Sequence, residues 1–93
     1  MYYLEVLGFC KLIRKIRKHP LKKNIIRDIE DLAYDPGKGK YIPRHDIYEL
    51  KYPNLRIYYL VKEGGIIIFG KDYEGTIIIL GHGNKNQQKR KLK

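Results

Sequence analysis

The chain has 93 residues, 43% of them hydrophobic, with 20 Lys and Arg against 10 Asp and Glu and a formal net charge of +10. This length suits one domain, and the apolar fraction excludes general disorder because it is large enough to form a core. A single Cys excludes an internal disulfide and a multi-cysteine zinc site, and no apolar run reaches the roughly 18 residues of a membrane span. Because Met1–Glu5 carries no signal-peptide pattern, we expect a cytoplasmic protein with no membrane partner.

The first half of the chain predicts a strand followed by two helices. Residues 2–6 are rich in Tyr, Leu and Val and end before Gly8, which indicates a strand. Apolar residues then recur at the spacing of one helix face, at Phe9, Leu12, Ile13 and Ile16. Pro20 ends this helix and suits the first turn of the next. The second apolar stripe comprises Leu21, Ile25, Ile29 and Leu32, and this helix is expected to end at Asp35–Gly37.

The two predicted helices hold an uninterrupted basic block. Residues 11–27 contain eight Lys and Arg residues and no acid, whereas residues 28–35 contain four acids. A second basic block, with five bases and no acid, occupies residues 85–93. Two such blocks in a small domain indicate binding to a polyanion such as RNA. The alternative is a lysine-rich surface that is merely solvated.

The second half changes to the period of two that is typical of half-buried strands. Residues 47–52 and 55–62 alternate apolar and polar side chains, with a turn at Pro53–Asn54. Glu63–Gly65 predicts a hairpin turn. The apolar runs 66–69 and 76–80 predict two central strands, joined by a polar turn at residues 71–75.

This order of elements predicts an α+β domain. An N-terminal strand and a helical hairpin should pack on an antiparallel sheet of four to five strands, leaving the other face or an edge for a ligand. We place the domain at residues 1–84 and a basic tail at residues 85–93. The expected core comprises Leu4, Val6, Leu12, Ile16, Ile25, Ile29, Leu32, Ile57, Tyr59, Ile67 and Ile78.

Three segments resemble a family of toxins. Ile42–Lys51, which reads IPRHDIYELK, and Leu55–Tyr59, which reads LRIYY, resemble the centre of the RelE/ParE/HigB superfamily. Ile79–Gly83, which reads ILGHG and runs into a Lys- and Gln-rich end, resembles the HigB branch. The resemblance implies a RelE-like fold and the toxin of a toxin–antitoxin pair, with an acidic antitoxin protein as its partner and no cofactor.

Most RelE and HigB relatives cut mRNA, usually on the ribosome, whereas several ParE relatives poison DNA gyrase. The resemblance therefore implies an mRNA-cleaving endoribonuclease that works by metal-free attack of the 2′-OH. A non-enzymatic nucleic-acid-binding or gyrase-directed protein on the same fold remains the alternative, because the fold cannot choose between them.

Three residues are the candidates for catalysis. Arg56 stands where the family has its strand arginine and could hold two phosphate oxygens, although a salt bridge to Glu49 is the alternative. Lys51 resembles a family base on the preceding strand, but it could equally be a solvated lysine. His82 matches the His of the HigB branch and could act as an acid or a base, or simply cap a strand end. We expect these three side chains to converge on one face.

Further residues are candidates for RNA contacts. Tyr48, Tyr52 and Tyr58 are expected on one exposed face, where tyrosines among bases would suit stacking of unpaired nucleotides. The three His residues have no metal-ligand spacing, so no metal is expected. The candidate RNA-binding residues are Lys11, Lys15, Arg44, His45, Tyr48, Lys85, Lys89 and Arg90.

Overall fold

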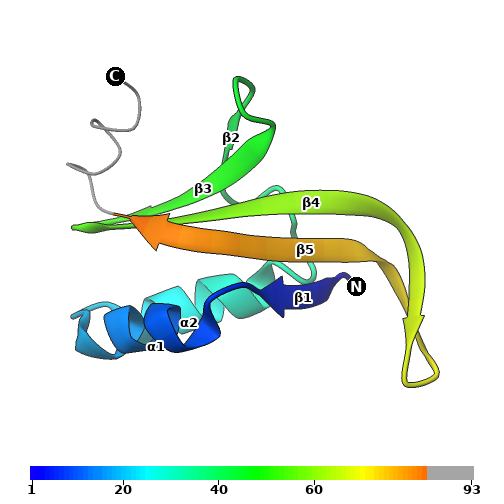
Figure 1. Ribbon diagram of the computed structural model, residues 1–93, viewed down its shortest axis with the longest axis horizontal. Coiled ribbons are helices and arrows are strands. Elements are labelled where there is room, and N and C mark those ends of the chain that lie inside the picture. Colours follow the sequence, from blue (N-terminus) through cyan, green and yellow to red (C-terminus); the bar gives the residue numbers. More distant parts are fainter. Residues whose placement is uncertain (84–93) are drawn as a thin grey trace.

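The computed structural model describes residues 1–83, which form two helices packed on one face of a five-stranded sheet (Figure 1). The predicted α+β class is confirmed. In chain order the elements are β1 (Tyr3–Val6), α1 (Phe9–Lys18), α2 (Lys22–Asp31), β2 (Lys40–Ile42), β3 (Ile47–Tyr52), β4 (Leu55–Ile68) and β5 (Lys71–Gly83).

The sheet is mixed, with strand order β1-β5-β4-β3-β2. Every neighbouring pair is antiparallel except β1 and β5, which run parallel. The expectation of an antiparallel sheet is therefore wrong at this one pair. A parallel pair needs a long crossover, and here the two helices and β2–β4 intervene between β1 and β5. The short edge strand β2 had no signal in the sequence pattern.

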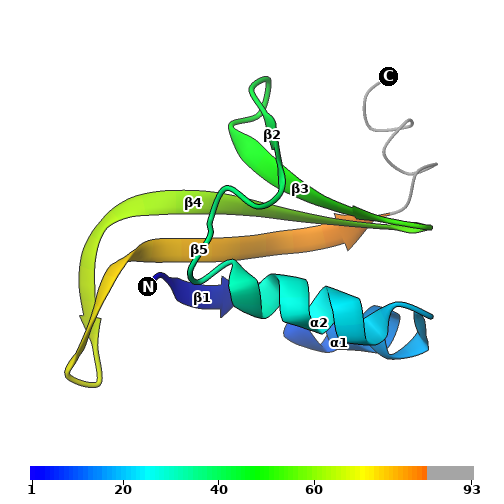
Figure 2. The same ribbon diagram turned by 180° about the vertical axis from the view of Figure 1, so that it is seen from behind.

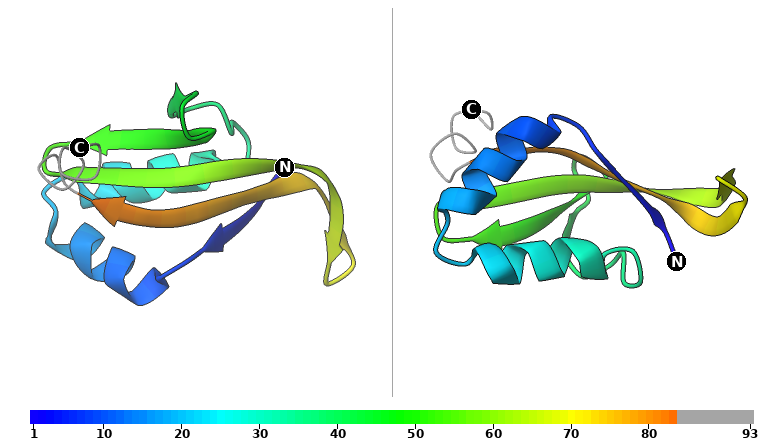
Figure 3. Two further views of the ribbon diagram at one scale, coloured as in Figure 1. Left: turned by 45° about the horizontal axis from the view of Figure 1, so that its top comes forward. Right: turned by 90° about the horizontal axis from the view of Figure 1, so that it is seen from below.

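Both helices lie against one face of the sheet (Figure 3), and each contains buried apolar residues. Leu12 and Ile16, one turn apart on α1, are both 2% exposed. Neither helix within residues 1–83 is long and apolar enough to cross a membrane. Phe9 was expected on the packed side of α1, but it is 58% exposed because it opens the first turn of the helix.

The core lies between the helices and the sheet. Its buried members are Leu12, Ile16, Ile25, Leu32, Leu50, Tyr52, Leu55, Ile57, Tyr59, Ile77 and Ile79. The expected core residues Leu4, Val6 and Ile29 are partly buried against it. Ile78 and Ile67 are not in the core. Ile78 lies between two inward-facing residues and so points to the other side of β5, and Ile67 is 70% exposed.

Strands β4 and β5 form one long hairpin that extends past the rest of the sheet and bends (Figure 2). The predicted turn at Glu63–Gly65 is instead a bulge, because the register shifts between Glu63 and Ile66. The turn lies at Phe69–Gly70, and Ile68 pairs with Lys71 across it. Two-residue turns and β-bulges both favour glycine with positive φ, so the Gly pair could not distinguish them.

Candidate nucleic-acid interface

Lys51 and Arg56 lie side by side on the face of the sheet opposite the helices. They are register partners across β3 and β4, and partners in an antiparallel pair project from the same face. Ile57 and Leu50, the next pair along, face the helices. An open pocket of about 500 Å³ adjoins the turn between these strands. Among the described residues it is lined by Lys51, Tyr52, Pro53, Asn54 and Arg56.

Arg56 is buried, with only 7% of its surface exposed. Its Nη1 donates to the carbonyl oxygens of Tyr52 at 2.6 Å and Leu55 at 3.2 Å. The guanidinium therefore ties together the two ends of the β3–β4 turn. An arginine committed to backbone carbonyls in this way stabilises the turn and presents little of its charge to a phosphate. Lys51 is exposed and is the accessible cation of this pair.

His82 lies on the opposite face of the sheet from Arg56. It pairs with Ile57, a fully buried residue that faces the helices. The cause is a bulge at Leu80, where the register steps from Tyr59–Ile79 to Tyr58–Gly81. Strict alternation from the inward-facing Ile79 would have put His82 on the Arg56 face, and the extra residue reverses this. The expected convergence of Lys51, Arg56 and His82 is therefore not found.

His82 instead belongs with the cations of α1. Partial burial lowers the pKa of the imidazole below its usual 6.5, and the charges of Lys15 and Lys11 lower it further. The side chain is therefore neutral at pH 7, and an anion bound at this point would favour its protonated form. His82 and the two lysines together form a group that suits a phosphate rather than a general acid–base pair.

The exposed side of α1 carries a row of cations with no acid among them. The basic residues of this helix are Lys11, Arg14, Lys15, Arg17 and Lys18, all exposed. None of them forms an ion pair with the part of the chain that the structure describes. Since a helix rises 1.5 Å per residue, the row is about 10 Å long. Residues 11–18 also hold five bases in eight positions, the highest density of bases along residues 1–83.

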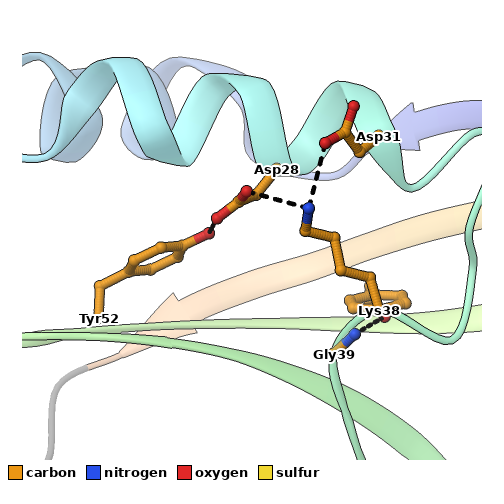
Figure 4. Close-up of polar contacts among 6 residues, drawn as sticks. Asp28, Asp31, Lys38, Gly39 and Tyr52 are labelled. Atoms are coloured by element: carbon orange, nitrogen blue, oxygen red, sulfur yellow. Dashed lines mark hydrogen bonds and ion pairs between the residues drawn. The ribbon is translucent and has the colours of Figure 1, made fainter.

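A polar network fixes α2 against β3 and the loop that follows α2 (Figure 4). Tyr52 donates to Asp28 at 2.7 Å, and the Lys38 ammonium lies 3.2 Å from Asp28 and 3.1 Å from Asp31. Partial burial raises the pKa of Asp28, but the hydrogen bonds from Tyr52 and Lys38 and the charges of Lys38 and Arg27 outweigh it. The net pKa lies below the usual 3.8. Burial and the bond to Asp28 together raise the pKa of Tyr52.

This network predicts an acid-sensitive contribution to stability. Because the pKa of Asp28 is lower in the folded chain than in the unfolded one, its stabilisation is complete above about pH 4. It is lost as the pH falls through the lower, folded value. We expect the free energy of unfolding to fall less steeply with acid in Asp28→Asn than in the wild type. Urea titrations at several pH values measure the free energy of unfolding of both proteins. An equal decrease with falling pH in the two would show that Asp28 contributes nothing to the acid sensitivity.

The tyrosines do not form the expected exposed face. Tyr52 points into the core, and Tyr48 stacks on Tyr59 with ring centroids 5.2 Å apart and 13° between the planes. Tyr58 lies on the other face, beside Glu49. The pairing of Tyr48 with the buried Tyr59 places it on the helix side, where it serves packing instead of base stacking.

The remaining candidates are scattered. Arg44 and His45 are exposed in the β2–β3 turn, away from the pocket at the other end of β3. Lys85, Lys89 and Arg90 lie outside the described residues. Among residues 1–83, no group of three or more His, Cys, Asp and Glu side chains is placed to hold a metal ion.

One residue that joins the helices to the pocket was not predicted. His19 accepts from the Leu21 N–H at 3.0 Å through Nδ1, and its Nε2 lies 2.6 Å from the carbonyl oxygen of Pro53. These contacts hold the β3–β4 turn against the loop between the helices. The only signal in the sequence was the His-Pro pair, which indicates a turn residue. This pair gives no indication that the side chain contacts Pro53.

The comparisons with known proteins add no relative. The chain matches no protein-family model, no curated protein and no solved structure. The resemblance to the RelE/ParE/HigB toxins therefore remains an expectation from three short segments.

Proposed function

We propose that this protein binds RNA through α1, with His82 and the lysines beside it as part of the contact surface. The observation that supports this most is the row of five α1 cations without an acidic partner among the described residues. Unpaired cations in a row attract the phosphate backbone and release its counterions. A helix face that only contributed to stability would instead carry acids four residues from these bases, because oppositely charged i,i+4 pairs stabilise a solvated helix.

Binding without catalysis is favoured over cleavage by the arrangement at the sheet. Metal-free cleavage needs a base, an acid and a cation around one phosphate. Arg56 is occupied by backbone carbonyls, and His82 lies across the sheet from Lys51. The one observation that supports the ribonuclease toxin is that Lys51 and Arg56 line the same pocket. In that second proposal an acidic antitoxin would cover the cationic surface.

The test is a comparison of two triple variants of equal charge. Lys11→Gln, Lys15→Gln and Lys18→Gln together remove three cations from α1. The control, Lys40→Gln, Lys62→Gln and Lys71→Gln, removes three exposed lysines from β2, β4 and β5. We expect the α1 variant to bind an unstructured RNA at least about tenfold more weakly in fluorescence anisotropy, and the control to bind within about twofold of wild type.

The same incubations distinguish the two functions when run on a denaturing gel. Intact RNA in every lane supports a binding protein. Cleavage that Lys51→Ala abolishes, with or without ribosomes present, would support the ribonuclease instead. Equal loss of affinity in both triple variants would show that only net charge matters, and the proposed α1 surface would be wrong.

A further inference from the structure

The hairpin of β4 and β5 continues beyond the rest of the sheet as residues 61–75, which we call the finger. β3 pairs with β4 only as far as Tyr59, and β1 pairs with β5 only from Thr76 onward. The finger bends out of the plane of the sheet, and its tip forms one end of the molecule (Figure 1).

The finger is anchored at its base. The Tyr2 hydroxyl donates to Glu63 at 2.7 Å, and the Met1 ammonium lies 3.1 Å from Glu74. Tyr3 and Tyr73 meet edge to face at 5.4 Å. Gly75 lies close to both Lys62 and Tyr2, because a Cβ there would collide with the Lys62 carbonyl oxygen and the Tyr2 ring. These contacts hold the finger in a fixed direction.

The tip exposes an apolar cluster. Ile66, Ile67 and Phe69 are 38%, 70% and 104% exposed. Phe69 and Gly70 have φ of +50° and +75°, the signature of a type I′ turn. Asn, Asp or Gly is normally found at the first turn position. A Phe there carries two costs, the strain of a positive φ in a bulky residue and the full exposure of an apolar ring. A fully exposed Phe at a strained turn position points to contact with something outside this chain.

The outer edge of β4 at the tip is also free of a neighbouring strand within the described residues. Ile68 and Lys71 flank the turn and form its hydrogen-bonded pair. By the alternation of an antiparallel ladder, Ile67 then turns its N–H and C=O outward. The tip therefore offers an apolar side chain and an unpaired backbone edge at the same residue.

We propose that the finger joins two copies of this protein by pairing the β4 edges antiparallel about a two-fold axis at Ile67. In this register Ile67 faces Ile67 of the other copy, and Ile66 faces Ile68. A second strand would hydrogen-bond to the free N–H and C=O groups of the β4 edge, whereas a lipid interior would leave them unpaired. A second copy therefore suits this edge better than a membrane does.

Charge also favours a second copy over RNA. The finger holds two bases, Lys62 and Lys71, and three acids, Glu63, Asp72 and Glu74, so unlike α1 it offers a polyanion no excess of positive charge. Contact through the fingers also keeps the cationic α1 surfaces of the two copies apart, because the tip of the finger and α1 lie at opposite ends of the molecule (Figure 1). Contact through any cationic face would bring like charges together.

The test is sedimentation velocity of the nuclease-treated full chain over a wide concentration range. We expect a reversible dimer for wild type, and Ile67→Lys, which sets like charges opposite each other at the axis, to weaken dimerisation at least about tenfold. Ile26→Lys, at an exposed isoleucine of α2, is the matched control and should dimerise like wild type. Circular dichroism verifies that both variants are folded.

A second measurement locates the contact. In a Cys10→Ser background, Ile67→Cys should form a disulfide-linked dimer on mild oxidation, because paired residues across an antiparallel axis lie within reach of a disulfide. Leu80→Cys, on the body of the sheet, should not. A wild-type monomer at every concentration would overturn the proposal, as would an Ile67→Lys dimer. Wild-type monomers that sediment with neutral phosphatidylcholine vesicles, under conditions where Ile67→Lys monomers do not, would assign the tip to lipid instead.

Discussion

Arg56→Ala is expected to lower the free energy of unfolding by about 2–4 kcal/mol while changing RNA affinity little. The side chain is 7% exposed, and its Nη1 donates to the carbonyl oxygens of Tyr52 and Leu55. Hydrogen bonds from a charged donor are worth about 1.5–3 kcal/mol, and truncation also removes the packing of the aliphatic stem. Urea unfolding followed by circular dichroism measures the loss of stability.

Lys51→Ala is the matched control for Arg56→Ala. The two residues are register partners on the same face, but Lys51 is exposed, so its truncation should change stability by no more than about 0.5 kcal/mol. If Arg56→Ala stays as stable as wild type and loses RNA binding, Arg56 is a phosphate contact and the pocket would replace α1 as the leading site.

Tyr59→Phe is expected to cost a similar amount, about 2–4 kcal/mol. The Tyr59 hydroxyl donates to the Pro36 carbonyl oxygen at 2.8 Å and accepts from the Gly39 N–H at 2.9 Å. Removal of one oxygen atom therefore leaves two backbone groups of the loop after α2 without their partner. That loop also carries Lys38, so its loosening would weaken the contact with Asp28.

The control for Tyr59→Phe is Tyr34→Phe, at a tyrosine that is 75% exposed and loses the same atom. Its stability should remain within about 0.5 kcal/mol of wild type. Equal stability of Tyr59→Phe and wild type in urea titrations would show that water replaces the lost hydroxyl, and the loop would then be held mainly by its ion pairs.

The helices were predicted well because their signal is local. Leu12 and Ile16 repeat at helical spacing, and Pro20 follows the end of α1 as expected. The bounds of α2 were predicted less well, because Pro20 lies before its first turn and the helix ends at Asp31, ahead of the expected Asp35–Gly37. The period of two likewise located β3 and the first part of β4. The parallel pairing of β1 with β5 depends on residues more than 70 positions apart, and no local pattern encodes it.

The candidate site was predicted less well because bulges change the phase of a strand. The bulge at Leu80 turns His82 toward the helices, and the bulge after Glu63 lets β4 continue where a turn was expected. Neither position carries a residue type that only a bulge would use. The burial of Arg56 depends on the fold of the β3–β4 turn around its guanidinium, which a charged residue in an alternating strand does not reveal.

The salt dependence of RNA binding tests the central claim, that α1 contacts the phosphate backbone, most directly. Each contacted phosphate of a single strand contributes about 0.7 to the slope of log Kd against log salt. The variant that lacks the cations of Lys11, Lys15 and Lys18 should therefore have a slope smaller than wild type by about 2. The control that lacks Lys40, Lys62 and Lys71 should keep the wild-type slope. An unchanged slope in the α1 variant would contradict the account.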